Sequence, residues 1–408
     1  MTRVAIVGGG TAGYEAAAEA SRNEAEVVLL EQSDFWEPSW HSWPDFILSQ
    51  EHSERPPALP NDVELIHDAF VTSICPGSLL TAEGRRVIFD SAVVGSGGKF
   101  MTAVFPGRGK PGVVILDNLE MYAELGRERS SMAHVVITGE GVHALRVADG
   151  LGRTGRKVTL LAAPWIEGFA SKEVRSVVKD AGARNGVNIL DSKFDGAVGC
   201  GHVEAVISGG TVVACDTLAV LPVRAPRIPR TSAETGVSGG LLVDKHLRSS
   251  SPLLYAAGCT AEPRECLPYP HTLERAPAKS GRVAGANATG HNLVFHPKRL
   301  AEASFFGLRW AKFGTSFCEA RRQGFMVSEV SRRWNQGSAC SIVYERPTGK
   351  VVGVEFVAEG ENERLGVIAS ITPPTSLQAI AYGESSDSSD ISMVSDTARL
   401  GLQAWSGS

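Results

Sequence analysis

The sequence predicts an α/β protein made of two βαβ units and a third part of a different kind. The first observation is an internal repeat, because residues 3–31 correspond, at a constant offset of 131, to residues 134–162. In each copy a short β-branched run meets glycines, an Ala-rich helical stretch follows, and a second apolar run closes the unit. The second observation is that residues 338–360 alternate apolar and polar side chains around a Thr-Gly turn, which is typical of an antiparallel sheet.

The composition is that of a globular protein. With 408 residues, 43% apolar and 21% charged, the chain has room for two to four domains and does not read as disordered. The net charge of -5 argues against a nucleic-acid partner. No apolar run approaches the roughly 18 residues of a membrane span, and the seven scattered cysteines include no CxxC pair. We therefore expect a soluble, cytoplasmic protein with reduced thiols and no metal site.

The glycines of the first copy have a spacing with a physical purpose. Gly8 permits a tight turn after the first strand, Gly10 lets the backbone approach a pyrophosphate, and Gly13 brings helix and strand together. The N-terminus of the following helix offers free N–H groups and a partial positive charge to phosphates. With Glu31 eighteen residues beyond Gly13, this copy predicts a dinucleotide-binding turn.

The remaining segments complete the α/β pattern. The pattern predicts a strand that ends in glycines at residues 86–98. It predicts a Pro/Gly connector followed by a helix at residues 106–125. Residues 201–221 read as hairpin-like runs with a turn at Gly209-Gly210. The Ser/Asp-rich residues 384–390 indicate a solvated loop before a last short helix.

The order of these motifs resembles that of the pyridine nucleotide-disulfide oxidoreductases, which are flavoproteins with two dinucleotide-binding domains. Within that superfamily the chain is most similar to NADH oxidases and coenzyme A-disulfide reductases. The resemblance rests on GGGTAG (8–13) with Glu31, VVGSG (93–97), the PG and GV pairs within 106–113, the second turn (139–144), GLLVDKHLRSSSPLLYAAGC (240–259) and APAKSGRVAGANATG (276–290).

The resemblance implies a glutathione-reductase-like arrangement of two Rossmann-like domains and a C-terminal α+β interface domain. Residues 1–110 and 240–295 would form the FAD-binding domain, interrupted by an NAD(P)H-binding-like domain at 111–239. Residues 296–408 would form the interface domain, through which a homodimer or a hetero-oligomer is expected. FAD is the expected cofactor, with NAD(P)H as a possible second nucleotide.

The resemblance also implies the FAD contacts. Glu31 would bind the adenosine ribose, the first turn the pyrophosphate, and Gly258 with its neighbour the ribityl chain, while a helix opening near Leu273 would face the flavin ring. Relatives have an aspartate where this chain has Cys259, and a thiol is the poorer acceptor. The expected cofactor-binding residues are Gly8, Gly10, Thr11, Ala12, Gly13, Glu31, Gly95, Ser96, Gly97, Gly258, Cys259, Thr272 and Leu273.

The segment after the ribose acid departs from the family. Relatives that reduce disulfides carry a redox cysteine there, and His41 stands in its place. Without a thiolate, disulfide reduction is not expected. His41 is a candidate acid–base group at flavin N5, or else an exposed loop histidine. His271 is the second candidate, or else a residue of a helix entry without chemistry.

Three tryptophans lie in the same segment, at Trp36, Trp40 and Trp43. By analogy they would shape an apolar substrate pocket beside the isoalloxazine ring. The alternative is that they pack a domain interface.

The second turn also departs from the family. Ala144 replaces its third glycine and Ala162 the acid that would hold an NAD ribose. Arg146 occupies the place where relatives commonly have a glutamate near the nicotinamide. The candidate residues for a nicotinamide nucleotide are Gly139, Gly141, Val142 and Arg146.

The expected function is therefore that of an FAD-dependent oxidoreductase that transfers hydride or electrons through flavin N5 without a cysteine intermediate. The donor would be NAD(P)H, and the acceptor a small molecule, a quinone or oxygen. Two alternatives stay open. One is a flavoprotein that has lost its NAD(P)H site and oxidises an organic or sulfur substrate. The other is a silent FAD-binding scaffold or a subunit of a hetero-oligomer.

Overall fold

The computed structural model divides the chain into two compact units. One consists of Met1–Ser42, Ser53–Met101 and Arg224–Lys298, and the other of Trp43–His52, Thr102–Val223 and Arg299–Ser408. The described residues are 1–33, 40–48, 59–101, 104–127, 132–139, 141–162, 171–264, 276–296, 300–322, 324–360, 376–382 and 389–406. Among their helices, none has the length and apolar character that crossing a membrane requires.

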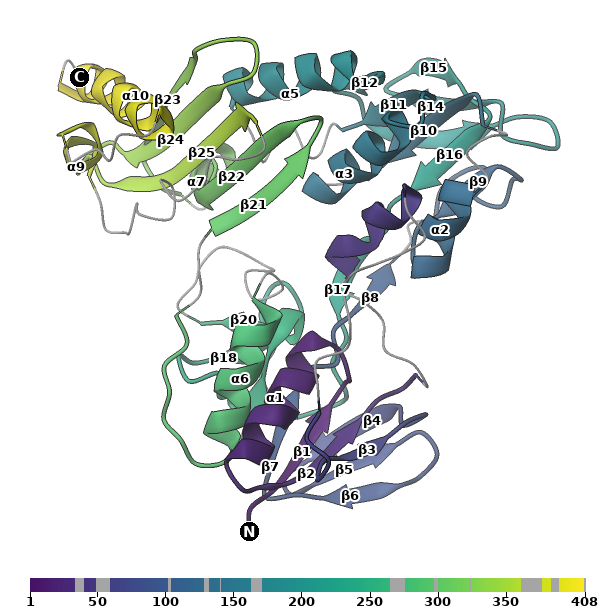
Figure 1. The fold of residues 1–408 in the computed structure, drawn as a ribbon, viewed down its shortest axis with the longest axis vertical. Helices are drawn as coiled ribbons and strands as arrows, with labels where there is room; N and C mark the ends of the chain where they lie inside the picture. Colours follow the sequence, from purple (N-terminus) through teal and green to yellow (C-terminus); the bar gives the residue numbers. More distant parts are fainter. Residues whose placement is uncertain are drawn as a thin grey trace. The chain divides into compact units, whose positions relative to one another are not determined.

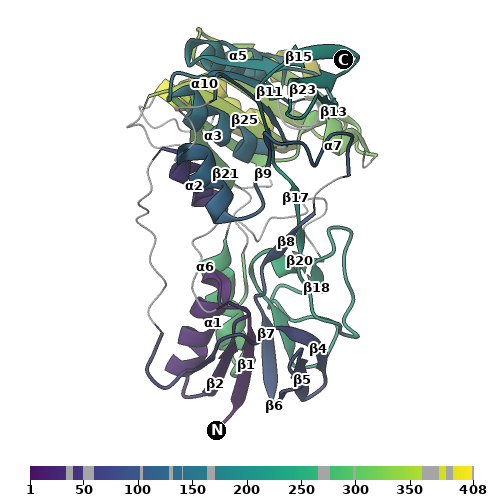
Figure 2. The same ribbon diagram turned by 90° about the vertical axis from the view of Figure 1, so that its right-hand side faces the viewer.

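The first unit is built on a five-stranded sheet in the order β19-β7-β1-β2-β3. Its neighbouring strands run parallel, so their short apolar runs are buried on both faces. Helices α1 and α6 lie side by side against it in both views (Figure 1, Figure 2). The bounds are β1 Arg3–Val7, α1 Thr11–Arg22, β2 Glu26–Leu30, β3 Glu64–Ile66, β7 Ser91–Val94, β19 Leu254–Ala256 and α6 Pro277–Ala288.

Three smaller sheets and a 3-10 helix complete this unit. β4, β5 and β6 form an antiparallel meander, β18 pairs with β20, and β8 pairs with β17. Their bounds are β4 Val71–Cys75, β5 Ser78–Thr81, β6 Arg86–Ile88, β8 Gly98–Met101, β17 Val223–Pro226, β18 Leu241–Val243, η3 Gly258–Thr260 and β20 Ala261–Pro263.

The second unit repeats the parallel design, as the internal repeat predicts. Its five-stranded sheet has the order β12-β11-β10-β16-β9 and is parallel throughout. The bounds are η1 Trp40–Ile47, β9 Val113–Ile115, α2 Leu119–Arg127, β10 His134–Thr138, α3 Gly141–Gly152, β11 Lys157–Leu161, α5 Lys172–Arg184, β12 Val187–Leu190 and β16 Thr217–Val220.

The predicted hairpin turn at Gly209-Gly210 is present. It joins β14 to β15, and both glycines have positive φ, 56° and 79°, as a two-residue hairpin turn requires. The antiparallel sheet that contains it consists of β13 Phe194–Val198, β14 Ala205–Ser208 and β15 Thr211–Ala214.

The C-terminal part forms the expected antiparallel sheet, in the order β21-β22-β25-β24-β23. One face is apolar and packs against α9 and α10. The elements are β21 Leu300–Phe305, β22 Leu308–Gly314, α7 Phe317–Arg322, β23 Val327–Arg333, β24 Ala339–Glu345, β25 Val351–Glu359, α9 Leu377–Tyr382 and α10 Ser389–Ser406.

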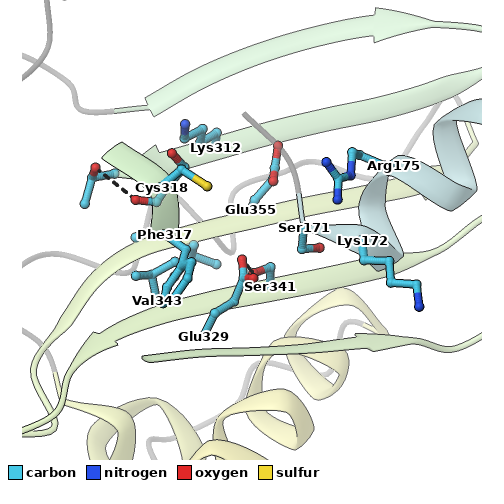
Figure 3. A pocket seen from close by; sticks show the side chains of 14 residues that line it. Ser171, Lys172, Arg175, Lys312, Phe317, Cys318, Glu329, Ser341, Val343 and Glu355 are labelled. Carbon is cyan, nitrogen blue, oxygen red and sulfur yellow. Dashed lines mark hydrogen bonds between the residues drawn. The ribbon is translucent and has the colours of Figure 1, made fainter. Parts of the chain in front are cut away.

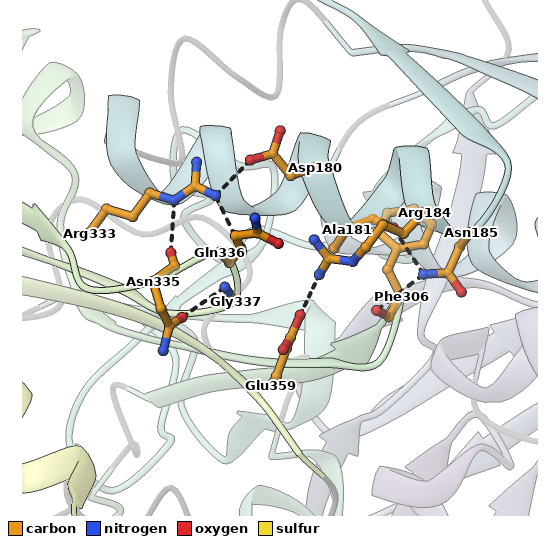
Figure 4. A network of polar contacts seen from close by, with 10 residues as sticks. All are labelled: Asp180, Ala181, Arg184, Asn185, Phe306, Arg333, Asn335, Gln336, Gly337 and Glu359. Atoms are coloured by element: carbon orange, nitrogen blue, oxygen red, sulfur yellow. Dashed lines mark hydrogen bonds and ion pairs between the residues drawn. The ribbon is translucent and has the colours of Figure 1, made fainter.

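Helix α5 joins the second parallel sheet to the antiparallel sheet. Arg333 donates to Asp180 at 2.6 Å, and Arg184 forms an ion pair with Glu359 (Figure 4). Asn185 donates to the carbonyl oxygen of Phe306 at 3.4 Å. Most of the predicted domains 111–239 and 296–408 thus share one compact unit, whereas residues 224–239 and 296–298 belong to the first unit. The predicted domain boundaries stay a prediction.

Candidate cofactor site

The first glycine turn is built so that only glycine fits at two of its positions. Gly8 follows β1 with a φ of +99°, and a Cβ on it would lie 2.5 Å from Cα of Ser96. A Cβ on Gly13 would overlap the carbonyl oxygen of Gly8. These two glycines fix the turn and hold the start of α1 against the end of the strand, as the spacing predicts.

Gly10, in contrast to Gly8 and Gly13, is not crowded by other atoms. A Cβ built on it would meet no atom within 4 Å, and its own φ is an ordinary -76°. It is the exposed N-cap of α1, and no side chain caps the helix there. The first N–H groups of α1 therefore border open space, where the backbone donors and the helix dipole suit a pyrophosphate.

Glu31 lies at the edge of this turn, directly after β2. The Gly9 N–H donates to its Oε2, and the Ser33 N–H donates to its Oε1 at 2.9 Å. These contacts place a half-buried carboxylate beside the turn, in the position that a ribose acid needs. Burial, together with the charge of Glu31, raises the pKa of Tyr14 above its usual value, so this phenol stays neutral.

Residues 95–97 close the turn from the end of β7. A Cβ on Gly95 would lie 3.1 Å from the Gly13 nitrogen, so a side chain there would crowd the start of α1. Ser96 donates its hydroxyl to the carbonyl oxygen of Arg227 at 2.5 Å, and Gly97 has a φ of +68°. The three predicted residues thus lie against the first turn.

The segment around Gly258 is brought to the same turn by α6. Gly258 has a φ of +67°, and a Cβ on it would lie 3.1 Å from the Cβ of Ala12. Its N–H donates to the buried hydroxyl of Ser280 at 2.9 Å. Cys259 follows as a half-buried thiol within η3. The structure therefore gathers residues from four distant parts of the sequence at one turn.

Sequence reasoning missed Ser280. Its hydroxyl accepts from Gly258 and donates to the carbonyl oxygen of Ala276 at 2.8 Å, at the uncapped start of α6. A lone serine within a helix has no pattern that marks such a role. The signal was its place within the APAKSGR motif, between Lys279 and Gly281.

The second glycine turn has a different backbone from the first. Its positive φ, +72°, falls at Gly141, whereas the repeat would place it at Gly139. A Cβ on Gly139 would lie 2.6 Å from the Cβ of Leu221. Ala144 and Ala162 are almost fully buried, at 2% and 1% exposure. The position of the ribose acid thus holds a buried methyl group, which accepts no hydrogen bond from a sugar.

Arg146 faces the segment that carries the predicted tryptophans. Its Nη2 donates to Oδ1 of Asp45 at 2.7 Å. Gly139, Gly141 and Val142 lie half-buried at the turn itself, at the start of α3. Their role toward a nicotinamide nucleotide stays a prediction.

Trp43 is packed inside the second unit. Its ring is 4% exposed and meets the ring of Tyr122 edge-on at 5.6 Å. The Tyr122 hydroxyl forms a hydrogen bond with Nε2 of His143 at 2.8 Å, and burial raises the pKa of Tyr122 far above its usual value. This placement favours the packing alternative for Trp43 over a substrate-pocket role.

Several other predicted residues lie outside the described part of the chain. These are Trp36, His271, Thr272 and Leu273, while Trp40 and His41 belong to η1 without a described side chain. Their proposed roles stay predictions. Within the described ranges no group of three or more His, Cys, Asp or Glu side chains is arranged to hold a metal ion.

The fold and the first turn define a class, the proteins that bind a dinucleotide on parallel α/β sheets. The chain matches the model of the pyridine nucleotide-disulphide oxidoreductases over residues 2–279. It belongs to this family, whose members are FAD-dependent oxidoreductases. The resemblance drawn from the motifs and the predicted fold class are both confirmed.

Individual relatives differ in how much of their length they share with this chain. A mercuric reductase from Acidithiobacillus ferrooxidans is 25% identical over 303 residues, which make up 70% of this chain and 53% of that protein. The chain therefore spans about half of that relative's length.

Two solved structures have the same fold. A NAD-dependent persulfide reductase from A. fulgidus has a TM-score of 0.85 at 19% identity, over 99% of this chain and 84% of that one. A water-forming NADH oxidase from Lactobacillus brevis has a TM-score of 0.84 at 15% identity, over 100% of this chain and 99% of that one. At these identities the likeness establishes the fold.

Proposed function

We propose that the chain is an FAD-dependent oxidoreductase that works without a cysteine intermediate. The observation that carries the proposal is the open space at Gly10, at the uncapped N-terminus of α1, in a turn where Gly8 and Gly13 leave no room for a side chain. Family membership supports it. When bound, FAD supplies hydride and electron transfer at the N5 atom of its ring.

The chain's own residues bind and orient the cofactor. The N–H groups at the start of α1 would hold the pyrophosphate, and the Glu31 carboxylate would accept hydrogen bonds from the adenosine ribose. Gly258, held by Ser280, would let the ribityl chain approach the start of α6. Each group reaches its place through strand ends that the parallel sheet brings to one edge.

The sequence at position 41 sets the chemistry apart from disulfide reduction. His41 stands where the family's disulfide-reducing members carry a thiol, and an imidazole cannot form a mixed disulfide. We infer that electrons leave the cofactor directly for a small molecule, a quinone or oxygen. His41 and His271 are the candidates to hold or move a proton near N5.

NAD(P)H is the proposed donor, and the family's pairing of two glycine turns supports it. The buried Ala162 favours a second candidate, in which the donor is an organic or sulfur substrate. With a methyl group in place of the acid, the second turn lacks a hydrogen-bond acceptor for a ribose at that position. A silent FAD-binding scaffold is the third outcome that an experiment must separate.

An anaerobic titration of the FAD-loaded chain distinguishes the three candidates. NADH or NADPH is added stepwise while the flavin absorbance is recorded. Bleaching by one nucleotide supports the proposal, sulfide is the probe for the second candidate, and dithionite serves as the positive control. Bleaching by sulfide without bleaching by either nucleotide favours the second candidate. Bleaching by dithionite alone would favour the third candidate, the silent FAD-binding scaffold.

A further inference from the structure

The connection between α7 and β23 presents two apolar side chains to solvent at one end of the antiparallel sheet. Phe325 is 48% exposed and Met326 is 66% exposed. We call this pair the apolar tip. The turn between β24 and β25 lies at the same end of the sheet, because Val327 at the start of β23 pairs with Glu345 at the end of β24. Single exposed apolar side chains are ordinary, whereas adjacent ones indicate a contact surface.

The backbone of the apolar tip is fixed by hydrogen bonds. Gly324 ends α7 with a φ of +84°, and its N–H donates to the carbonyl oxygen of Arg321 at 3.0 Å. The Phe325 N–H donates to the carbonyl oxygen of Ala320 at 3.0 Å, which completes a Schellman motif. The residue after the glycine of such a motif frequently packs on its helix, yet nearly half of Phe325 is exposed. The carbonyl oxygen of Met326 accepts from the backbone of the β24–β25 turn at 2.8 Å.

Helix α7 attaches the apolar tip to the sheet through its inner face. Ala320 is fully buried and packs with Val327 and Val343. The ring of Phe317 lies against Val343 in Figure 3. The tip therefore continues from a helix that is held on the sheet, and its side chains stay on the outside.

Basic side chains surround the apolar tip. Arg321 and Arg322 are exposed on the last turn of α7, and within the described part of the chain neither forms an ion pair. Arg346 and Lys350 are exposed at the β24–β25 turn. We call these four residues the basic rim. Unpaired cations next to exposed apolar side chains attract an anionic surface.

The acidic side chains nearest the basic rim in the sequence are already engaged by the protein. Glu345 accepts from a threonine hydroxyl of its own turn at 2.8 Å. Glu319 forms an ion pair with the buried Lys312 at 3.3 Å. Glu329 lines the cavity of Figure 3, where it accepts from the Ser341 hydroxyl at 2.7 Å. The rim thus carries a local excess of positive charge in a chain whose net charge is -5.

From this arrangement we infer that the apolar tip and the basic rim dock the protein on an anionic lipid bilayer. Phe325 and Met326 would enter the boundary between headgroups and acyl chains, and the rim would lie at the lipid phosphates. Because the chain as a whole is acidic, an anionic bilayer would attract this end and repel the rest.

The size of the apolar tip favours a bilayer over a folded partner. A stable protein–protein interface takes roughly 20–30 residues a side with matching shapes. A bilayer adapts to whatever enters it, so a small apolar tip with cations around it is sufficient for peripheral, reversible binding.

The test is co-sedimentation of the purified 408-residue chain with lipid vesicles. Vesicles of phosphatidylcholine are compared with vesicles of phosphatidylcholine and phosphatidylglycerol in equal parts. Binding to the anionic vesicles should be about tenfold tighter, and it should weaken as salt is raised. Absence of binding to the anionic vesicles would overturn the inference and leave an acidic protein as the partner of this end. Equal binding to the two kinds of vesicle would overturn it as well.

A double variant tests the apolar tip. Phe325→Ser with Met326→Ser should weaken binding to the anionic vesicles about tenfold, because less apolar surface leaves water. The matched control is Leu80→Ser with Ile88→Ser, two exposed apolar side chains that lie within the paired strands β5 and β6. This control should bind like the wild type. An equal loss in the two double variants, or no loss in the first, would contradict the role of the tip.

A second double variant tests the basic rim. Arg321→Gln with Arg322→Gln should weaken binding to the anionic vesicles about tenfold and leave binding to phosphatidylcholine unchanged. The matched control is Arg85→Gln with Arg86→Gln, an adjacent exposed pair in the first unit. Unchanged binding in the test variant, or an equal loss in the control, would contradict the role of the rim. Because sedimentation does not involve flavin, the result is independent of the proposed function.

Discussion

The two glycine turns share a spacing but differ in what they can hold. The first turn has its positive φ at Gly8, open space at Gly10 and a carboxylate at Glu31. The second has its positive φ at Gly141 and a buried methyl group at Ala162. The spacing of glycines therefore specifies a strand, a turn and a helix, whereas the ligand depends on the residue at the end of the second strand and on the space above the turn.

The largest expected effect comes from filling the space at Gly10. A Cβ at position 10 would meet no atom within 4 Å and the φ there is ordinary, so Gly10→Asp should leave the unfolding free energy nearly unchanged. The new carboxylate would lie where the negatively charged pyrophosphate would bind. The two charges repel each other, so FAD affinity should fall by about a hundredfold or more. Flavin fluorescence titration of the apoprotein measures this.

The matched control is Gly109→Asp, whose Cβ also meets no atom within 4 Å but which lies far from the first turn in the sequence. It should bind FAD like the wild type. Equal FAD affinity in the two variants would mean that the first turn is not the pyrophosphate site.

The next largest effect is expected at the third glycine position of each turn, Gly13 in the first and Ala144 in the second. Gly13→Ala would overlap the Gly8 carbonyl oxygen and force α1 away from the strand, which should lower the unfolding free energy by about 1–3 kcal/mol. Ala144→Gly in the second turn only removes a buried methyl group from a helix, at about 1 kcal/mol. Chemical denaturation compares them. A smaller loss in Gly13→Ala than in Ala144→Gly would contradict the packing described for the first turn.

A third prediction restores an acid at Ala162, so that the second turn can be compared directly with the first. Ala162→Glu places a carboxylate at the end of β11, where Glu31 stands after β2 in the first unit. If the second turn binds a nicotinamide nucleotide, the KM for NADH should fall about fivefold to tenfold with little change in kcat. Steady-state kinetics with NADH and NADPH measure this, and an unchanged KM for NADH would count against a nucleotide at the second turn.

The smallest effect is expected at the ion pair beside the second turn. Asp45 is well exposed and Arg146 partly so, and such pairs contribute less than about 1 kcal/mol. Asp45→Asn should therefore lower the unfolding free energy by less than that amount, with the loss shrinking further in high salt. Thermal unfolding at two salt concentrations measures it. A loss several times larger would show that this contact organises the second turn.

Much of the fold could be predicted because its signals are local. The β-branched runs of the two repeats, the Gly209-Gly210 turn and the alternation in residues 338–360 each appear where the sequence indicates. The shift of positive φ from Gly139 to Gly141 could not be predicted, since the two turns have the same glycine spacing at these positions. Two further contacts join residues far apart in the sequence and could not be predicted either. They are the hydrogen bond from Gly258 to the Ser280 hydroxyl and the packing of Trp43 against Tyr122.

A row of polar side chains on the antiparallel sheet also could not be predicted from the sequence. Lys312, Ser341 and Glu355 lie on three strands, and only the register of the antiparallel sheet aligns them. A one-residue slip in any strand would turn its side chain to the apolar face. Such a row of side chains can be found only after the pairing is known.

The most direct test of the central claim is the stoichiometry of FAD in the purified 408-residue chain. The absorbance of flavin released by denaturation is compared with the protein concentration, with and without prior addition of FAD. One FAD per chain is the predicted result, since the first turn combines open space at Gly10 with the carboxylate of Glu31. A colourless protein that retains no flavin after addition of excess FAD would contradict the account.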